Sequence, residues 1–120
     1  MKPLILALVT LIAAACHAGA RAPERAYGGD AERGRQLVRT YGCHSCHTIP
    51  GVRGADGLVG PPLTRMGARV YVAGHLSNTP ENLTRWIQNP PAVRPDTAMP
   101  ATGVTDEDVR HIVAYLYSLK

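Results

Sequence analysis

The segment that most constrains this chain is Cys43-His44-Ser45-Cys46-His47, in which two thiols stand three positions apart and an imidazole follows at once. This spacing is typical of haem c attachment, in which both thiols bond to the porphyrin and the histidine coordinates its iron. A structural zinc site usually needs two such pairs, and the sequence has no second one. A thioredoxin-like dithiol would lie in a βαβ pattern, and no strands are predicted before the motif. We therefore expect one covalent haem c, bound through Cys43 and Cys46, with His47 as an iron ligand.

The first twenty residues have the pattern of a secretory signal peptide. Lys2 precedes an apolar run over residues 3–15, and Ala18-Gly19-Ala20 fits a cleavage site. The run is too short to cross a bilayer comfortably but suits the hydrophobic region of a signal. We expect residues 1–20 to be removed and the protein to be periplasmic, where haem c is attached in bacteria. Membrane contact is expected only if Cys16 is lipidated or the N-terminus is retained as an anchor.

The rest of the chain is one small domain with few aromatic side chains. The 120-residue chain has no Phe, five Tyr and one Trp, so side-chain burial alone would stabilise it only marginally. An enclosed porphyrin would supply the missing apolar surface, so we expect folding and haem binding to be coupled.

The charge of the chain is mildly basic. Removal of residues 1–20 would take away one charged side chain, Lys2. The remaining 12 basic and 9 acidic side chains give a formal charge of +3. This charge fits either a solvated surface or a docking site for an acidic redox partner. Nucleic-acid binding is not expected, because the sequence has no basic stripe interleaved with aromatic residues.

Three helices are predicted after a flexible leader over residues 21–29. The first covers residues 30–41, with Asp at the N-cap and a glycine after its end. The middle helix covers residues 79–88, with Thr at the N-cap and Pro at the first helical position. The last covers residues 105–119. Its apolar stripe consists of Val109, Ile112, Val113, Leu116 and Leu119, with Tyr115 alongside.

Gly34 predicts how the end helices pack. A glycine inside a helix costs about 1 kcal/mol relative to alanine, so we expect the last helix to cross the first closely at this point, with Val38 one turn further on the same face. Residues 48–78 are rich in Gly and Pro and predict loops at the edge of the haem. No strand alternation is evident, so the expected fold class is all-α.

The sixth iron ligand decides between electron transfer and chemistry on a small molecule. Met99 is favoured, because Pro95 and Pro100 stiffen the loop that would hold its thioether against iron. Met66 is a flexible side chain expected to line the pocket or lie at the surface.

Three histidines are the remaining candidates for a role at the iron. His75 is a weaker candidate for a bis-histidine site. His111 lies off the apolar stripe of the last helix, so we expect it to face solvent. His44 is expected to be an exposed spacer within the attachment motif.

Residues 30–120 resemble a small class I, mono-haem cytochrome c. The shared features, in chain order, are the helix with Gly34, the Cys43–His47 motif, Gly60-Pro61-Pro62-Leu63, the helix with Trp86, Thr97-Ala98-Met99-Pro100 and the closing helix. The resemblance implies about three main helices and loops wrapped around one covalent haem, with the N- and C-terminal helices packed together. It also implies His47 and Met99 as axial ligands of a one-electron carrier that is not an enzyme.

The resemblance implies roles for residues around the haem as well. The Pro61 carbonyl would accept a hydrogen bond from the His47 ring and fix its orientation. Leu63 would press on the porphyrin, and Trp86 would lie beside the methionine.

The same resemblance points to residues near the haem propionates. Thr97 would approach a propionate, and Arg69 and Tyr71 are further candidate partners. The family often has an aromatic residue one turn after the helix glycine, where this chain has Val38.

A narrower similarity runs through residues 69–74 (Arg-Val-Tyr-Val-Ala-Gly), 78–83 (Asn-Thr-Pro-Glu-Asn-Leu) and 86–87 (Trp-Ile). These segments are similar to the cytochrome c domains of subunit II of bacterial haem-copper oxidases. The similarity implies a protein that donates electrons to, or serves within, a respiratory oxidase chain. Two alternatives stay open: a haem enzyme or gas- or peroxide-binding protein with a labile sixth ligand, and an electron-accepting subunit of a periplasmic dehydrogenase.

Overall fold

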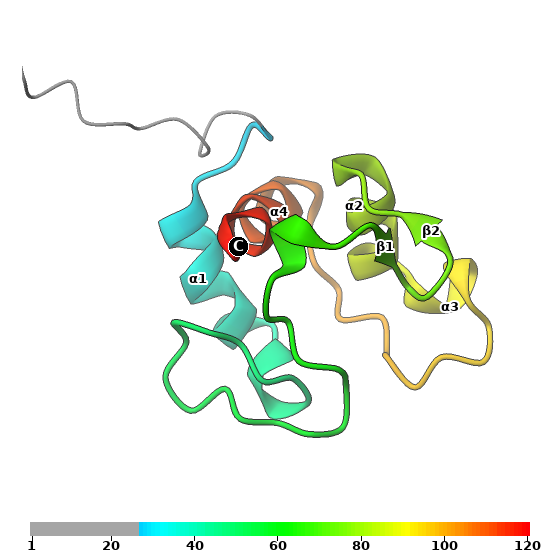
Figure 1. Ribbon diagram of the computed structural model, residues 1–120, viewed down its shortest axis with the longest axis horizontal. Helices are drawn as coiled ribbons and strands as arrows, with labels where there is room; N and C mark the ends of the chain where they lie inside the picture. Colours follow the sequence, from blue (N-terminus) through cyan, green and yellow to red (C-terminus); the bar gives the residue numbers. More distant parts are fainter. Residues whose placement is uncertain (1–26) are drawn as a thin grey trace, which may run out of the picture.

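The computed structural model describes residues 27–120 (Figure 1). The predicted signal peptide and residues 21–26 of the predicted leader lie outside the described residues. In chain order, the elements are α1 (Ala31–Thr40), η1 (Cys43–Ser45), η2 (Met66–Ala68), β1 (Tyr71–Val72), β2 (Leu76–Ser77), α2 (Pro80–Gln88), α3 (Pro90–Val93) and α4 (Asp106–Ser118). The three predicted helices are confirmed as α1, α2 and α4, and the domain is mainly helical.

The ends of α1 and α4 follow from their capping residues. The Asp30 carboxylate accepts the Arg33 N–H at 2.9 Å, and Gly42 adopts a left-handed conformation (φ +75°) after the last turn of α1. The Thr105 hydroxyl oxygen accepts the Asp108 N–H at 3.1 Å at the start of α4. Three acidic residues in the first turn of α4 favour its positive end.

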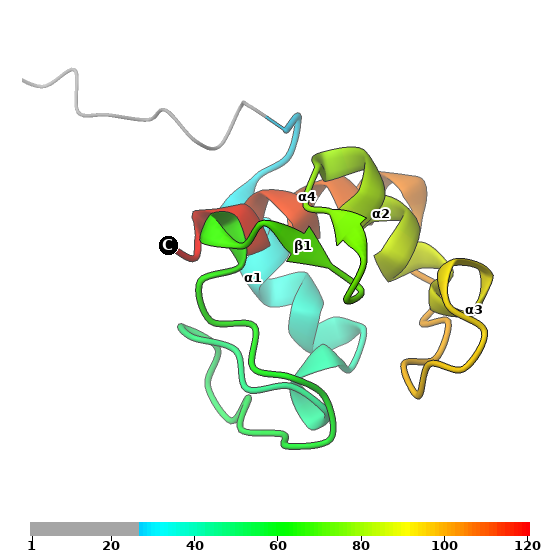
Figure 2. The ribbon, with the colours of Figure 1, turned by 45° about the vertical axis from the view of Figure 1, so that its right-hand side comes forward.

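The predicted close crossing of α1 and α4 is confirmed (Figures 1 and 2). A Cβ placed on Gly34 would lie 1.9 Å from the His111 carbonyl oxygen, so only glycine fits there. Val38, one turn further along α1, is only 1% exposed and packs with the buried stripe of α4. The two ends of the domain therefore form one apolar core.

The prediction that His111 faces solvent is wrong. His111 is half-buried, and its Nδ1 accepts the Asp30 N–H at 2.8 Å. The periodicity of α4 could not reveal this contact, because the first turn of α1 covers a position that lies outside the apolar stripe.

The middle of the chain contains two short elements that the sequence pattern does not predict. Strands β1 and β2 form a two-stranded antiparallel hairpin, whose turn uses Ala73 and Gly74 with positive φ. Helix α3 is a single turn capped by Asn89, whose side chain accepts the Ala92 N–H at 3.3 Å. Within residues 27–120, none of the helices combines the length and the apolar character needed to cross a membrane.

Candidate functional site

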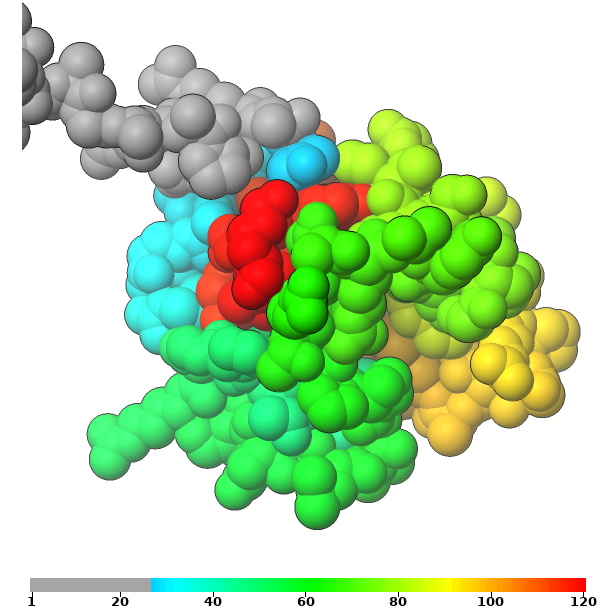
Figure 3. Space-filling view, in the orientation of Figure 1, coloured from blue at the N-terminus to red at the C-terminus, as the bar shows by residue number. Residues whose placement is uncertain are grey.

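A cavity of about 560 Å³ lies between the attachment motif, the hairpin, α2, α4 and the loop before α4. In the view of Figure 3, a hollow is bordered by the green loop segments and by the yellow region around α3. The apolar residues that line the cavity include Val38, Leu63, Leu83, Ile87, Ile112 and Leu116. Arg69 and Arg94 are the charged residues that line it, so its wall is apolar with a basic contribution.

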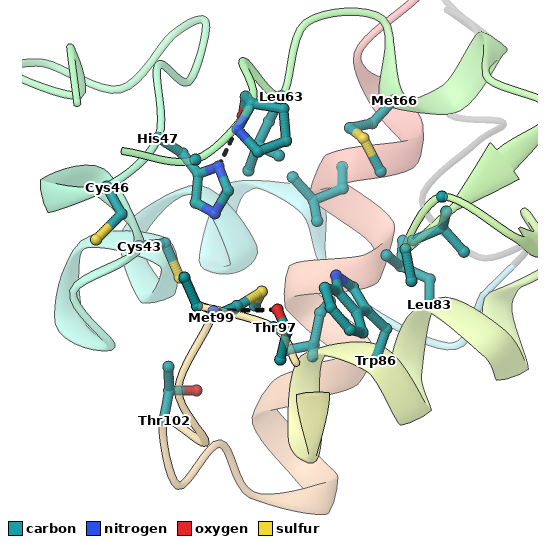
Figure 4. Close-up of a pocket in the computed structure, with 18 of the residues that line it drawn as sticks. Cys43, Cys46, His47, Leu63, Met66, Leu83, Trp86, Thr97, Met99 and Thr102 are labelled. Carbon is teal, nitrogen blue, oxygen red and sulfur yellow. Dashed lines mark hydrogen bonds between the residues drawn. The ribbon is translucent and has the colours of Figure 1, made fainter. Parts of the chain in front are cut away.

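The attachment motif lies at one side of this cavity. Turn η1 follows directly after α1, so the packing of α1 on α4 fixes the position of Cys43. Cys43, Cys46 and His47 all line the cavity, and both thiols are free (Figure 4). Burial raises the pKa of the Cys43 thiol, which matches its apolar surroundings.

The orientation of His47 is set by a hydrogen bond to the backbone. Its Nδ1 lies 2.7 Å from the Pro61 carbonyl oxygen. Because a carbonyl oxygen only accepts, Nδ1 carries the proton and Nε2 keeps a free lone pair. Gly60 allows this approach, since a Cβ there would lie 2.3 Å from the His47 ring. The Nε2 atom is therefore available to a metal in the cavity.

The methionine side of the cavity comes from the loop before α4. Met99 and Thr97 both line the cavity, and the Met99 N–H donates to the Thr97 hydroxyl oxygen at 3.1 Å. Figure 4 shows the second ring nitrogen of His47 pointing away from its hydrogen bond and toward the side where Met99 lies. An imidazole and a thioether thus reach the same cavity from separate loops.

The other predicted site residues also line the cavity. Leu63, Trp86, Tyr71 and Arg69 are in its wall, and Tyr71 is 60% exposed. The Arg69 guanidinium donates to the carbonyl oxygens of residues 62 and 64, to the latter at 3.0 Å. The Thr97 hydroxyl accepts the Met99 N–H.

The remaining ligand candidates lie in different settings. Met66 is 4% exposed and lines the cavity, in agreement with the first of its two expected places. His75 is exposed, lies outside the cavity lining and has its Nδ1 3.1 Å from the Ala73 carbonyl oxygen. The prediction of an exposed His44 is wrong: the residue is half-buried and its Nδ1 is enclosed, because the motif is folded against the rest of the domain.

The donor set and the cavity fit a covalent haem c. Two free thiols lie beside an imidazole with a free Nε2, and the surrounding wall is mostly apolar. A porphyrin needs such a wall, and its iron takes a nitrogen or thioether ligand. Within residues 27–120, no three His, Cys, Asp or Glu side chains gather into a set that could hold a metal ion by themselves.

Two polar residues at the cavity were missed by the sequence analysis. Asn78 makes hydrogen bonds to the backbone of η2 and of Arg69 behind the cavity wall. Thr102 lines the cavity, and its buried hydroxyl has no hydrogen-bond partner among the described residues. Neither belongs to a motif with fixed spacing, so no local signal could have found them.

Comparison with known proteins identifies the relatives of this chain. Residues 31–120 match the family described as Cytochrome c. Cytochrome c oxidase subunit 2 of Alkalihalophilus pseudofirmus is 38% identical over 91 residues, which cover 75% of this chain and 26% of that protein. The same subunit of Bacillus sp. strain PS3 is 34% identical over 89 residues, covering 71% and 25%, and that of Bacillus subtilis is 30% identical over 94 residues, covering 75% and 26%.

These matches confirm the two resemblances drawn from the motifs. The chain spans about a quarter of the length of these subunits. The family match over residues 31–120 contains the attachment motif and every residue that lines the cavity. Because the family match extends from the start of α1 to the last residue, it includes every helix and strand that the structure describes. The chain therefore belongs to the cytochrome c family, which implies a covalent haem c at Cys43 and Cys46.

Proposed function

We propose that this protein is a one-electron carrier with a single haem c, whose iron has His47 and Met99 as axial ligands. The observation that carries the proposal is the 2.7 Å contact between His47 Nδ1 and the Pro61 carbonyl, which leaves Nε2 free in a cavity that Met99 also lines. When bound, the haem supplies one-electron chemistry, because its iron cycles between two oxidation states.

The residues of the chain position and tune this centre. Cys43 and Cys46 tether it, and Pro61 holds the His47 ring and makes it a stronger donor. The apolar wall favours the less charged ferrous state and raises the reduction potential. Thr97, Arg69 and Tyr71 are proposed to lie near the propionates, with Leu63 against the porphyrin and Trp86 beside the methionine.

The partner is proposed from the relatives. Their names place them in cytochrome c oxidase, so we propose that this protein serves a respiratory oxidase chain. Segment 53–71 carries Arg53, Arg65 and Arg69 against the single carboxylate of Asp56, a basic excess that fits an acidic partner. The pattern of residues 1–20 supports export to the periplasm.

A labile sixth ligand is the second candidate, because few contacts hold the loop around Met99. Such a protein would bind carbon monoxide or peroxide at the iron. Carbon monoxide added to the reduced holoprotein distinguishes the two: a six-coordinate carrier binds it slowly or hardly at all, and a haem enzyme or gas-binding protein binds it fast.

The proposed ligands are tested by replacing each methionine with leucine, which conserves volume. Oxidised Met99→Leu holoprotein should lose the near-infrared sulfur-to-iron charge-transfer band, and Met66→Leu should keep it. An unchanged band in Met99→Leu contradicts the proposal. Loss of the band in both variants would also contradict it, provided that circular dichroism shows both to be folded.

A further inference from the structure

The Asn78 side chain has three hydrogen bonds behind the cavity wall. Its Nδ2 donates to the carbonyl oxygens of Met66 at 2.8 Å and Arg69 at 2.9 Å. Its Oδ1 accepts the Tyr117 hydroxyl at 3.0 Å. The NH2 group of the amide therefore acts only as a donor and its oxygen only as an acceptor, which fixes the orientation of the side chain. Asn78 therefore joins the C-terminal part of α4 to the segment 66–69.

The segment held by Asn78 is also packed tightly on α4. A Cβ on Gly67 would lie 2.1 Å from the Tyr117 carbonyl oxygen, and the Gly67 N–H donates to the Leu119 carbonyl at 2.9 Å. The Asn78 N–H donates to the Val70 carbonyl at 2.9 Å, just beyond the segment. The backbone that leads into Arg69 is thus fixed on both sides.

Arg69 carries this fixation to the loop beside His47. Its guanidinium donates to the carbonyls of Pro62 and Thr64, the latter at 3.0 Å. These two residues flank Leu63, whose N–H donates to the Thr48 carbonyl at 2.8 Å. Pro61 directly precedes Pro62, and its carbonyl oxygen lies 2.7 Å from His47 Nδ1.

We propose that Asn78 is a positioning residue for His47, acting through Arg69. Hydrogen bonds and chain connectivity make up the path: Asn78 fixes the Arg69 backbone, the Arg69 side chain fixes the carbonyls that follow Pro61, and the Pro61 carbonyl orients the histidine ring. A carbonyl that accepts from Nδ1–H raises the basicity of a ligating histidine. The inference rests on the proposed function, because it takes His47 as the proximal ligand.

The test measures the exchange rate of the His47 Nδ1 proton by NMR in the reduced holoprotein. Three variants are compared with the wild type: Asn78→Ala, Arg69→Lys and the double variant. Lysine keeps the positive charge but cannot span two carbonyls as the planar guanidinium does. Each single variant should speed up exchange by about tenfold, the effect of one lost hydrogen bond. The double variant should be no faster than the faster single variant, because both act on one contact.

Two further variants keep the test interpretable. Asn82→Ala removes an exposed amide that donates to the Ser77 carbonyl at 3.0 Å, away from the segment 66–69, and should leave the exchange rate unchanged. If Asn78→Ala does not fold, Tyr117→Phe removes only the bond to Asn78 Oδ1 and should speed up exchange about twofold to threefold. The reduction potential of each variant should rise as exchange becomes faster, since a less basic histidine stabilises the ferric state less.

The outcomes separate this inference from the proposed function. Unchanged exchange in Asn78→Ala, with a lower free energy of unfolding, would show a purely structural role and overturn the inference. If the increases in exchange rate of the two single variants multiply in the double variant, the path through Arg69 is overturned. If the NMR chemical shift of the His47 Nδ1 proton in the wild type shows no effect of iron ligation, the proposed function itself fails.

Discussion

The two loops that bring ligands to the cavity are held very differently. The loop after the attachment motif, residues 48–64, is here called the histidine loop, and residues 94–104 are called the methionine loop. In the histidine loop, Ile49, Val52 and Ala55 are at most 7% exposed and form part of the core. The histidine loop is therefore built into the domain.

Side chains from the end helices add to this fixation. Arg35 and Arg39 of α1 donate to the carbonyls of residues 51 and 53, the first at 3.3 Å, and Tyr115 of α4 donates to the Pro50 carbonyl. Backbone bonds connect the histidine loop to the motif, with Gly60 N–H donating to the Cys46 carbonyl at 2.7 Å. The ring of His47 thus rests on a scaffold that both end helices support.

The methionine loop has few such contacts. Val104 is its buried apolar residue, and the ion pair of Arg94 with Asp96 at 3.0 Å is exposed. The hydrogen bond from Met99 N–H to Thr97 is the contact that acts directly on the methionine backbone. The difference indicates that the histidine side of the site is held more firmly than the methionine side, since exposed ion pairs contribute little to stability.

The largest effect is expected when a methyl group is added next to His47. In Gly60→Ala the new Cβ would lie 2.3 Å from the His47 ring, so the free energy of unfolding of the holoprotein should fall by about 3 kcal/mol. Gly103→Ala in the methionine loop is the matched control. A Cβ at position 103 would meet no neighbouring atom within 4 Å. Only the positive φ (+74°) should therefore lower the free energy of unfolding, by about 1 kcal/mol. If denaturant titrations show equal losses of unfolding free energy in Gly60→Ala and Gly103→Ala, the two loops do not differ in how tightly they are packed.

An intermediate loss of stability is expected at alkaline pH, when Tyr117 of α4 ionises. Burial raises the pKa of Tyr117 from 10 to about 12. The unfolded chain then loses this proton at lower pH than the folded chain, so stability is complete below pH 10 and falls as pH rises toward 12, by about 2 kcal/mol.

Tyr117→Phe isolates this contribution. The difference in unfolding free energy between wild type and Tyr117→Phe should be constant below pH 10 and should shrink between pH 10 and about 12. A difference that stays constant through this range would show that Tyr117 has no part in the alkaline loss.

The smallest effect is expected in the methionine loop. Thr97→Val removes the acceptor of the Met99 N–H and should lower the free energy of unfolding by about 1 kcal/mol. Thr102→Val is the control, because the Thr102 hydroxyl has no partner among the described residues, and its change should stay within about 0.5 kcal/mol. A larger loss in Thr102→Val than in Thr97→Val would mean that the contacts of the methionine loop have been misassigned.

Much of the fold could be predicted from local signals. Capping residues and apolar periodicity located α1, α2 and α4, and Gly34 predicted the close crossing of α1 and α4. The spacing of the cysteines predicted the haem chemistry because that chemistry is local in sequence. The two prolines of its loop pointed to Met99, whereas the role of Pro61 in the cavity wall needed the family resemblance.

Contacts between distant segments could not be predicted. His111 receives the Asp30 N–H from 81 positions away, and Asn78 contacts a tyrosine 39 positions away. Neither contact leaves a periodic trace in the sequence, since each depends on how helices and loops meet in space. The hairpin and α3 were missed because elements of two to four residues are too short to show a period.

Titration of the oxidised wild-type holoprotein with imidazole tests the central claim most directly. If His47 is held more firmly than Met99, imidazole should displace Met99 first and abolish the sulfur-to-iron band in a saturable way, while NMR shows the His47 Nδ1 proton in place and protected from exchange. Loss of protection at His47 before the band disappears, or imidazole binding with the band intact, would contradict the account.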